Sequence, residues 1–442
     1  MSRTSYIRQG AAVPLAYAFL ITLMFTVGCS GETDPLEEAG HDPAQENSSS
    51  ESPSTAPGSD DTNDPGTSEG DRHPSCDSAN VVGEAPSHET QYIQAGFTRY
   101  AQIAAPNGGL IKIFGSPQTG DERIRRAHSL LSFYLKAVPN SAYGADKREV
   151  ANRMAQNNAI LVMPSGAHGE GPDVELDAQP LYEDETPVEG SAWYMQNNWE
   201  HRDAAFEEIF HLLHDTGIGT YLPGALPEYQ SLLLAEAEAA LSDGRWGIPT
   251  DPEVNGWIAE LREEGSLAQE YIASVIDSYY GLWGPWDEAD GGMWGVYIAK
   301  TRDEIVQSDP QGGSLLESFL SEWLDYEVHL AAELSGDFSM TFDASTPYTH
   351  KSQYLVHVTL TGDNPSNIFA NAQDNTLRGN TASNTLDGMD GTDTAVYCEN
   401  RSTYTITKTG DEVVVDGNEG RDVLRNMEVV HFADGAVLVS DL

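Results

Sequence analysis

The chain has 442 residues but only three cysteines, few basic residues and a single long apolar run. Three cysteines exclude a disulfide-rich scaffold and a thiolate zinc cluster, because both need several cysteines at paired spacings. Any metal ion must therefore be held by histidine and carboxylate side chains. Only 23 lysines and arginines stand against 70 acidic residues, and the formal net charge is −47. Because this charge repels phosphate backbones, we expect no nucleic-acid partner.

The apolar run covers residues 11–27, follows Arg3 and Arg8, and ends just before Cys29. A charged start, an apolar middle and a small residue before a cleavage point are typical of an export signal. The segment resembles a bacterial lipoprotein signal, in which residues 1–28 are removed and Cys29 carries the lipid. The resemblance implies an outer-membrane or cell-surface lipoprotein that contacts the membrane only through this anchor. Ordinary secretion and an uncleaved membrane helix are the alternatives.

Residues 29–85 consist largely of Ser, Pro, Thr, Gly, Asp and Glu. Such a segment cannot bury enough apolar surface to fold, so we predict a disordered acidic tether. With Cys29 lipidated, Cys76 and Cys398 are the remaining thiols, and in an oxidising compartment they can pair. A disulfide between them would join the start of the folded region to the C-terminal domain. Two unpaired thiols are the alternative.

Residues 86–350 predict a mixed lobe followed by a helical lobe. Strand patterns at 97–104, 110–114 and 159–163 alternate with helical patterns at 121–138 and 145–156. Beyond them the apolar spacing is almost entirely helical, over 199–216, 227–242, 254–282, 300–307 and 313–334. Strands and helices in this order predict an α+β or α/β first half, and with the helical lobe behind it we expect an α+β fold.

The segment Glu207-Glu208-Ile209-Phe210-His211 is the most informative part of the sequence. On a helix, Glu207 and His211 lie within about 40° of each other, and His214 falls on the same stripe. The adjoining apolar face presses this stripe against another element, where buried polar groups need a partner such as a metal ion. The alternative is a solvated Glu/His face on an amphipathic helix.

This pentad resembles the HExxH helix of zincin metallopeptidases, with glutamate in place of the first histidine. The resemblance implies that Glu207 and His211 hold zinc and that Glu208 is the catalytic general base. In the gluzincin group the third ligand is a glutamate on a later helix, and Glu270 fits that place; His214 is the rival third ligand. The glutamate adds negative charge, which favours a harder metal and weakens the activation of water.

The resemblance implies a zinc-dependent peptidase at the bacterial cell surface, acting on protein or peptide substrates with a metal-activated water. Glu208 and His211 also form an ExxH pair of the kind used in di-iron helix bundles, but such a site needs a second ExxH on another helix, and none of the other predicted helices carries one. The alternative function is a catalytically inactive, calcium-stabilised binding or structural protein of the cell surface.

The C-terminal part repeats with a period of nine, over residues 370–378, 379–387 and 388–396. This is the period of the RTX β-roll, and residues 351–442 resemble the RTX repeats and strand-rich tail of serralysin-like and haemolysin-type exported proteins. The resemblance implies bound calcium, with Asp390 and Asp393 as ligands. Asn375 and Asn384 occupy the position of Asp393 in the earlier repeats, and their neutral carbonyls predict weak calcium binding or none there. A β-rich domain without calcium is the alternative.

Overall fold

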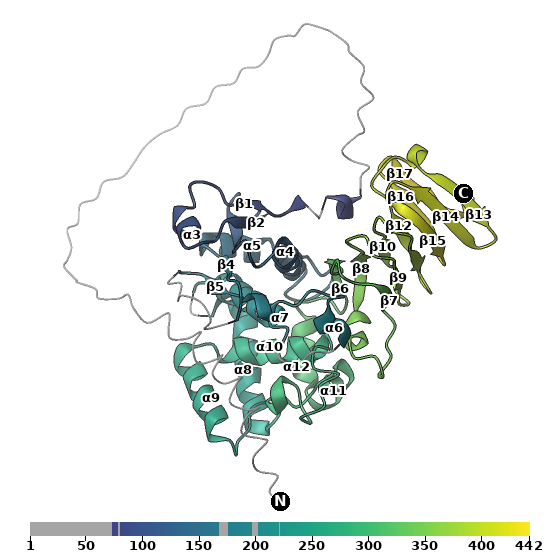
Figure 1. Ribbon diagram of the computed structural model, residues 1–442. Coiled ribbons are helices and arrows are strands. Elements are labelled where there is room, and N and C mark those ends of the chain that lie inside the picture. Colours follow the sequence, from purple (N-terminus) through teal and green to yellow (C-terminus); the bar gives the residue numbers. More distant parts are fainter. Residues whose placement is uncertain (1–72, 78–79, 168–175, 197–201, 221) are drawn as a thin grey trace, which may run out of the picture.

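A computed structural model describes residues 73–77, 80–167, 176–196, 202–220 and 222–442. In this part the chain combines helices with three mixed sheets (Figure 1), an architecture that agrees with the predicted α+β class. The predicted signal, the lipidation site Cys29 and the start of the predicted helix at residue 199 lie outside the described residues. None of the described helices is both long and apolar enough to cross a membrane.

The first sheet has five strands in the order of the chain, namely β1 (Gly83–Glu84), β2 (Arg99–Ala104), β3 (Leu110–Gly115), β4 (Ile160–Met163) and β5 (Gln179–Pro180). The β2–β3 hairpin is antiparallel, whereas β3, β4 and β5 are parallel. Short α3 (Thr90–Gln94) precedes the hairpin, and α4 (Asp121–Leu135) and α5 (Arg148–Gln156) pack against the sheet. The predicted hairpin, both helices and the strand at 159–163 are confirmed.

A helical layer lies beyond this sheet (Figure 1). Its helices are α6 (Ala192–Gln196), α7 (Ala205–Leu213), α8 (Pro227–Asp243), α9 (Pro252–Glu264), α10 (Leu267–Tyr279), α11 (Arg302–Ser308) and α12 (Pro310–Glu317). The helix predicted over 254–282 is two helices, because Gly265 ends α9 in a left-handed conformation with φ +82°. Glycine adopts this conformation without strain, so the chain can turn there and begin α10.

The C-terminal strands form two six-stranded sheets. The first contains β6 (Leu324–His329), β8 (Leu355–Thr359), β10 (Thr376–Arg378), β12 (Thr394–Val396), β16 (Val429–Phe432) and β17 (Gly435–Leu438). The second contains β7 (Gly336–Ser339), β9 (Ser366–Phe369), β11 (Thr385–Asp387), β13 (Thr405–Thr409), β14 (Glu412–Gly417) and β15 (Gly420–Arg425). From β6 to β12 successive strands alternate between the sheets, and the strands of each repeat begin at residues 376, 385 and 394. The nine-residue repeat therefore provides one strand per repeat.

The helix predicted over residues 313–334 is wrong in its second half. Helix α12 ends at Glu317, and Leu324–His329 forms strand β6, whose side chains are alternately buried and partly exposed. Leu324, Tyr326 and Val328 face the core while polar residues lie between them, which is the two-residue period of a strand. Because β6 and β7 already belong to the C-terminal sheets, these sheets begin before the boundary predicted at 350/351. Between them and β8 the chain forms the short helix α13 (Thr349–Ser352).

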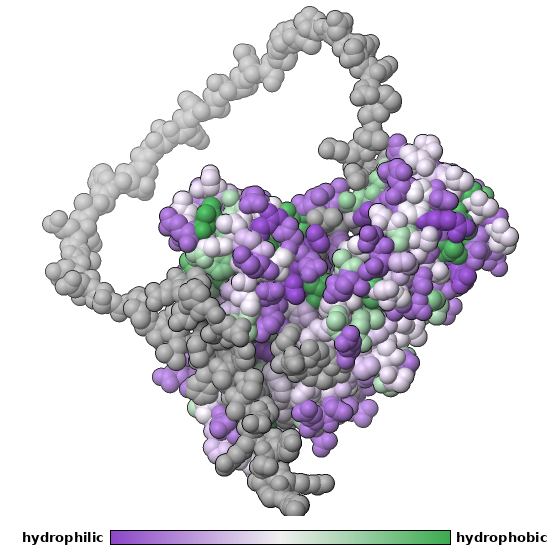
Figure 2. Space-filling model, in the orientation of Figure 1, coloured by the Kyte–Doolittle hydropathy of each residue, from purple (hydrophilic) through white to green (hydrophobic). Residues whose placement is uncertain are grey.

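Cys76 and Cys398 form a disulfide, which is the first of the two alternatives that the sequence left open. The short 3-10 helix Pro74–Cys76 is thereby held against the C-terminal sheets, where Arg378 Nη1 donates to the Ser75 carbonyl at 3.4 Å. One continuous apolar core runs from the helical layer into both C-terminal sheets. Figure 2 shows hydrophilic residues over most of the visible face, in keeping with the excess of acidic residues.

Candidate metal centre

Helix α7 is a core helix, and all nine of its residues are buried. Its apolar side chains pack between α4 and α10, so that Glu207, Glu208 and His211 are drawn inside with exposures of only 5%, 2% and 3%. The helix continues into a π-helical turn, His214–Gly219, that ends at a glycine with φ +107°. The interpretation of this stripe as a solvated Glu/His face is therefore wrong.

The expected metal ligands lie together in this buried helix. Glu207, Glu208 and His211 each offer one ligand atom, and these atoms lie within 4.8 Å of one another. Glu270, in the first turn of α10, has its Oε1 3.6 Å from His211 Nε2. On the other side of the ring, His211 Nδ1 is 3.6 Å from Glu208 Oε2. Glu207, Glu208 and His211 thus form one close group, and Glu270 approaches the same ring from its Nε2 side. Histidine nitrogen and carboxylate oxygens are donors that fit zinc or a harder divalent cation.

The rival ligand His214 lies outside this group. Its Nε2 is 2.5 Å from Gln230 Oε1 on α8, and its ring contacts Phe210 edge to face. Burial and the neighbouring His211 lower the pKa of His214 to about 4, so the ring is neutral at pH 7. We therefore assign His214 to the packing between α7 and α8.

Several further side chains reach the site from elements that the sequence analysis did not single out. Gln179, on edge strand β5, donates from Nε2 to Glu208 Oε2 at 2.8 Å. Arg202, just before α7, forms an ion pair with Glu207. Asp277 on α10 lies 3.9 Å from the same guanidinium. In the sequence, Arg202 is visible only as an arginine before an acidic pair, and Asp277 only as an aspartate within an apolar helix. Gln179 carries no such signal.

Negative charge exceeds positive charge in this cluster. Among the described residues, five carboxylates (Glu185, Glu207, Glu208, Glu270 and Asp277) surround two cationic groups, Arg202 and His211. We call these seven residues the α7 cluster. Burying unpaired charges is costly, so such a cluster takes up protons or a cation.

The pKa values in the α7 cluster follow from this imbalance. Burial, and then the neighbouring carboxylates, raise the pKa values of Glu185 and Glu270 to about 8. Burial also raises the pKa of Asp277, with Glu207 adding to the effect. Burial alone would lower the pKa of His211, but Glu270 and Glu208 raise it to about 10. Without a metal ion, the cluster therefore holds several protons at pH 7.

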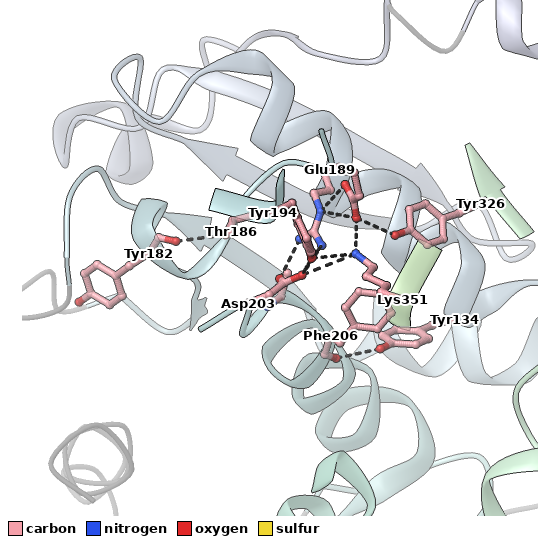
Figure 3. Close-up of polar contacts among 11 residues, drawn as sticks. Tyr134, Tyr182, Thr186, Glu189, Tyr194, Asp203, Phe206, Tyr326 and Lys351 are labelled. Carbon is pink, nitrogen blue, oxygen red and sulfur yellow. Dashed lines mark hydrogen bonds and ion pairs between the residues drawn. The ribbon is translucent and has the colours of Figure 1, made fainter. Parts of the chain in front are cut away.

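A second buried charge cluster adjoins the first, and its charges balance. Figure 3 shows Glu189, Tyr194, Asp203 and Lys351 converging on one point. Arg126 donates to Glu189 at 2.9 Å and to Asp203 at 2.6 Å, while Lys351 pairs with Glu189. The phenol of Tyr326 donates to Glu189 Oε1 at 3.0 Å. We call these residues the Glu189 network, which consists of Arg126, Glu189, Tyr194, Asp203, Tyr326 and Lys351.

The α7 cluster has the features of a metal site. His211 Nε2 is buried without a hydrogen-bond partner, the donors are a nitrogen and carboxylate oxygens, and a divalent cation would offset two of the excess negative charges. No family model, no curated protein and no solved structure matches this chain. The geometry of the α7 cluster is therefore the guide to its chemistry. That geometry gives a buried Glu-Glu-His group that could hold a metal ion.

The two expected calcium ligands differ in their surroundings. Asp390 is exposed, whereas Asp393 is fully buried. Its Oδ1 accepts from the Asn375 amide at 2.8 Å and its Oδ2 has no hydrogen-bond partner. Burial, and then the charges of Glu428 and other acids nearby, raise the pKa of Asp393 to about 7. In the preceding repeat, Asn384 Nδ2 instead donates to the Ser366 carbonyl at 2.9 Å.

Proposed function

We propose that this protein is a metal-dependent peptidase with its active site on α7. The observation that carries the proposal is the meeting of Glu207 and His211, one helical turn apart, with Glu270 of α10 facing His211. Glu207, His211 and Glu270 would hold the ion, and zinc is the metal that the likeness to HExxH helices favours. When bound, zinc supplies a Lewis acid that polarises a carbonyl and acidifies water.

The remaining residues of the site have roles in positioning and proton transfer. Glu208 accepts a proton from the attacking water and later gives it to the leaving amine. Gln179 fixes the Glu208 carboxylate by donating to its Oε2.

The experiment is a comparison of two histidine variants on consecutive turns. Wild-type full-length protein, His211→Ala and His214→Ala are purified without added metal, and their metal content is measured by mass spectrometry. We expect about one zinc per chain in wild type and in His214→Ala, and none in His211→Ala. Equal metal in both variants, or none in wild type after zinc is supplied, would contradict the proposed site.

Hydrolysis is tested separately from metal binding. In Glu208→Gln the metal content should stay unchanged, while cleavage of a broad peptide library falls by roughly 10²–10⁴-fold, the usual contribution of a general base. A metal-loaded wild type that cleaves no peptide would favour the alternative of a catalytically inactive surface protein.

We further propose that the C-terminal sheets bind calcium at Asp393 and that Cys29 anchors the chain to the cell surface. The buried Asp393 Oδ2 without a partner supports the calcium proposal. Alternating strands with a nine-residue period are also the arrangement expected of RTX repeats. The mass of the N-terminal fragment tests for the lipid. The added mass of the lipid should be present in wild type and missing from a Cys29→Ser variant.

A further inference from the structure

Arg202 lies between two carboxylates, one of which is paired with it while the other is farther away. Its Nη1 forms the ion pair with Glu207 Oε2, on the first expected metal ligand, while Asp277 Oδ2 is 3.9 Å from the same nitrogen. Asp277 is almost completely buried, and its other oxygen, Oδ1, has no hydrogen-bond partner. One nitrogen of the guanidinium is therefore paired with Glu207 and lies within a short movement of Asp277.

The space around this pair permits such a movement. Arg202 and Asp277 line a small cavity together with Trp193, Leu282 and Trp283, and its volume of about 10 Å³ is close to the space of one water molecule. The guanidinium carbon also lies 5.2 Å from the centre of the Trp294 ring. In contrast, Asp203 is fixed by Arg126, which holds the backbone next to Arg202 in place.

A metal ion and the guanidinium compete for Glu207. Both are cations, and at close range in a buried site their mutual repulsion is strong. Glu207 replaces the neutral histidine of the HExxH helix, and Arg202 supplies the positive charge that offsets this replacement. An arginine left at Glu207 would weaken metal binding. An arginine moved to Asp277 would instead pair with the ionised form of this buried carboxyl, whose proton passes to solvent in the exchange.

We propose that Arg202 is an exchangeable counter-ion that leaves Glu207 for Asp277 when the metal binds. This inference rests on the proposed metal site and adds a positioning residue to it. Asp277 is not one of the proposed metal ligands, yet it determines metal affinity because it receives the displaced guanidinium. The exchange also keeps the partly buried Arg202 paired in both states, which avoids the cost of an isolated charge.

The test is a zinc titration of four full-length proteins against a chromophoric chelator: wild type, Asp277→Asn, Arg202→Gln and the double variant. We expect Asp277→Asn to weaken zinc binding by about 5- to 150-fold, the usual range of coupling between sites. Arg202→Gln should bind zinc at least as tightly as wild type, because the competing cation is gone. In the Arg202→Gln background, Asp277→Asn should then change the affinity by less than about 2-fold, since coupled residues are not additive.

Two controls separate this exchange from general damage to the fold. Asp303→Asn removes the same charge from an exposed position on α11 and should leave zinc affinity unchanged. Arg202→Lys keeps a cation that can exchange, so its zinc affinity should still depend on Asp277. Far-UV circular dichroism verifies that each variant is folded.

Tryptophan fluorescence reports the movement itself. Zinc should change the emission of wild type as the guanidinium leaves the Trp294 ring, and Trp294→Phe should lose most of this change while keeping its zinc affinity. Zinc binding that is equally tight in wild type and Asp277→Asn would overturn the exchange and leave the metal site standing. A wild type that binds no zinc would overturn the metal site itself.

Discussion

The α7 cluster and the Glu189 network lie side by side in the same core, and consecutive residues, Arg202 and Asp203, belong to one each. In the Glu189 network two cations meet two carboxylates, and phenols complete the hydrogen bonds. In the α7 cluster five carboxylates meet two cations, and Asp277 Oδ1 and His211 Nε2 lack hydrogen-bond partners. The balanced cluster is complete within the chain, whereas the unbalanced one needs something from outside it.

Charge balance therefore distinguishes buried charges that stabilise the fold from buried charges that bind a cation. Lys351 of α13 and Tyr326 of β6 reach Glu189 from the C-terminal part of the chain, so the Glu189 network joins that part to the helical layer. Removing one of its members should damage the fold. Removing a carboxylate from the α7 cluster should instead increase the stability of the metal-free protein and lower only its affinity for a cation.

The largest effect is expected at Arg126. Arg126→Met leaves Glu189 and Asp203 buried with Lys351 as their remaining cation, and it should lower the free energy of unfolding by about 3–5 kcal/mol. Urea denaturation measures the loss. The exposed Arg401→Met is the matched control and should change stability by less than about 0.5 kcal/mol. A loss below about 1 kcal/mol at Arg126 would remove the distinction between the clusters.

The two clusters should respond to pH differently. A carboxyl whose pKa is raised by folding keeps a proton that the unfolded chain has released, so stability falls as pH rises between the two pKa values. With pKa values of about 8, Glu185 and Glu270 should each reduce the stability of metal-free protein from about pH 5 to pH 8. The slope is up to about 1.4 kcal/mol per pH unit for each group.

His211 adds to this loss above its unfolded pKa, because its folded pKa is also raised. For Glu189, burial would raise the pKa, but Arg126 and Lys351 lower it well below the usual range. Its contribution to stability is thus constant from pH 5 to 8 and is lost only under more acidic conditions. Thermal melts in a chelator, repeated with zinc, test the difference, and zinc should flatten the slope. A metal-free protein whose stability is level across this range would contradict the charge imbalance.

A smaller effect of opposite sign is expected at Glu270. Glu270→Gln removes a carboxyl that must take up a proton to be buried in metal-free protein at pH 7. Metal-free protein should therefore gain about 1 kcal/mol of stability, while zinc affinity falls at least about 10-fold. Denaturation in a chelator and zinc titration measure the two effects. Glu263→Gln, at an exposed position of α9, is the control for both. A destabilised metal-free Glu270→Gln would place Glu270 with the structural charges instead.

The smallest effect is expected at Asp393, a third kind of buried charge. Asp393→Asn introduces the residue found at positions 375 and 384, so without calcium the stability should change by less than about 1 kcal/mol. Calcium should raise the melting temperature of wild type and leave that of Asp393→Asn unchanged. If the two proteins respond equally to calcium, Asp393 is not its ligand.

The sequence predicted those features that depend on local periodicity. The stripe of Glu207 and His211 follows from helical spacing, and the strands at 376, 385 and 394 follow from the nine-residue repeat. Glu270 was found only through the resemblance to gluzincins, because a position 59 residues away has no periodic relation to His211. The alternation of Leu324, Tyr326 and Val328 is typical of a strand. Because the spacing of the apolar residues around it is helical, the whole of 313–334 was predicted as a helix.

Arg202 and Asp277 were beyond the reach of local patterns. Their contact depends on how α10 packs against the start of α7, and charge balance in a core becomes visible only when distant segments are assembled. Arg202 stands shortly before the acidic pair of α7, and this position was nevertheless a usable signal, since a cation near the core needs a partner. The charge balance of a buried cluster therefore identifies site residues, such as Arg202 and Asp277, that the spacing of a motif does not.

The disulfide also determines what a protease can release from this molecule. Cys76 and Cys398 are 322 positions apart in the chain and covalently joined. A single cut anywhere between them leaves both fragments attached to each other. Nicked protein would run as one species on a non-reducing gel and separate only after reduction, so the covalent link from the N-terminal segment to the C-terminal sheets would survive cleavage of the domain between them.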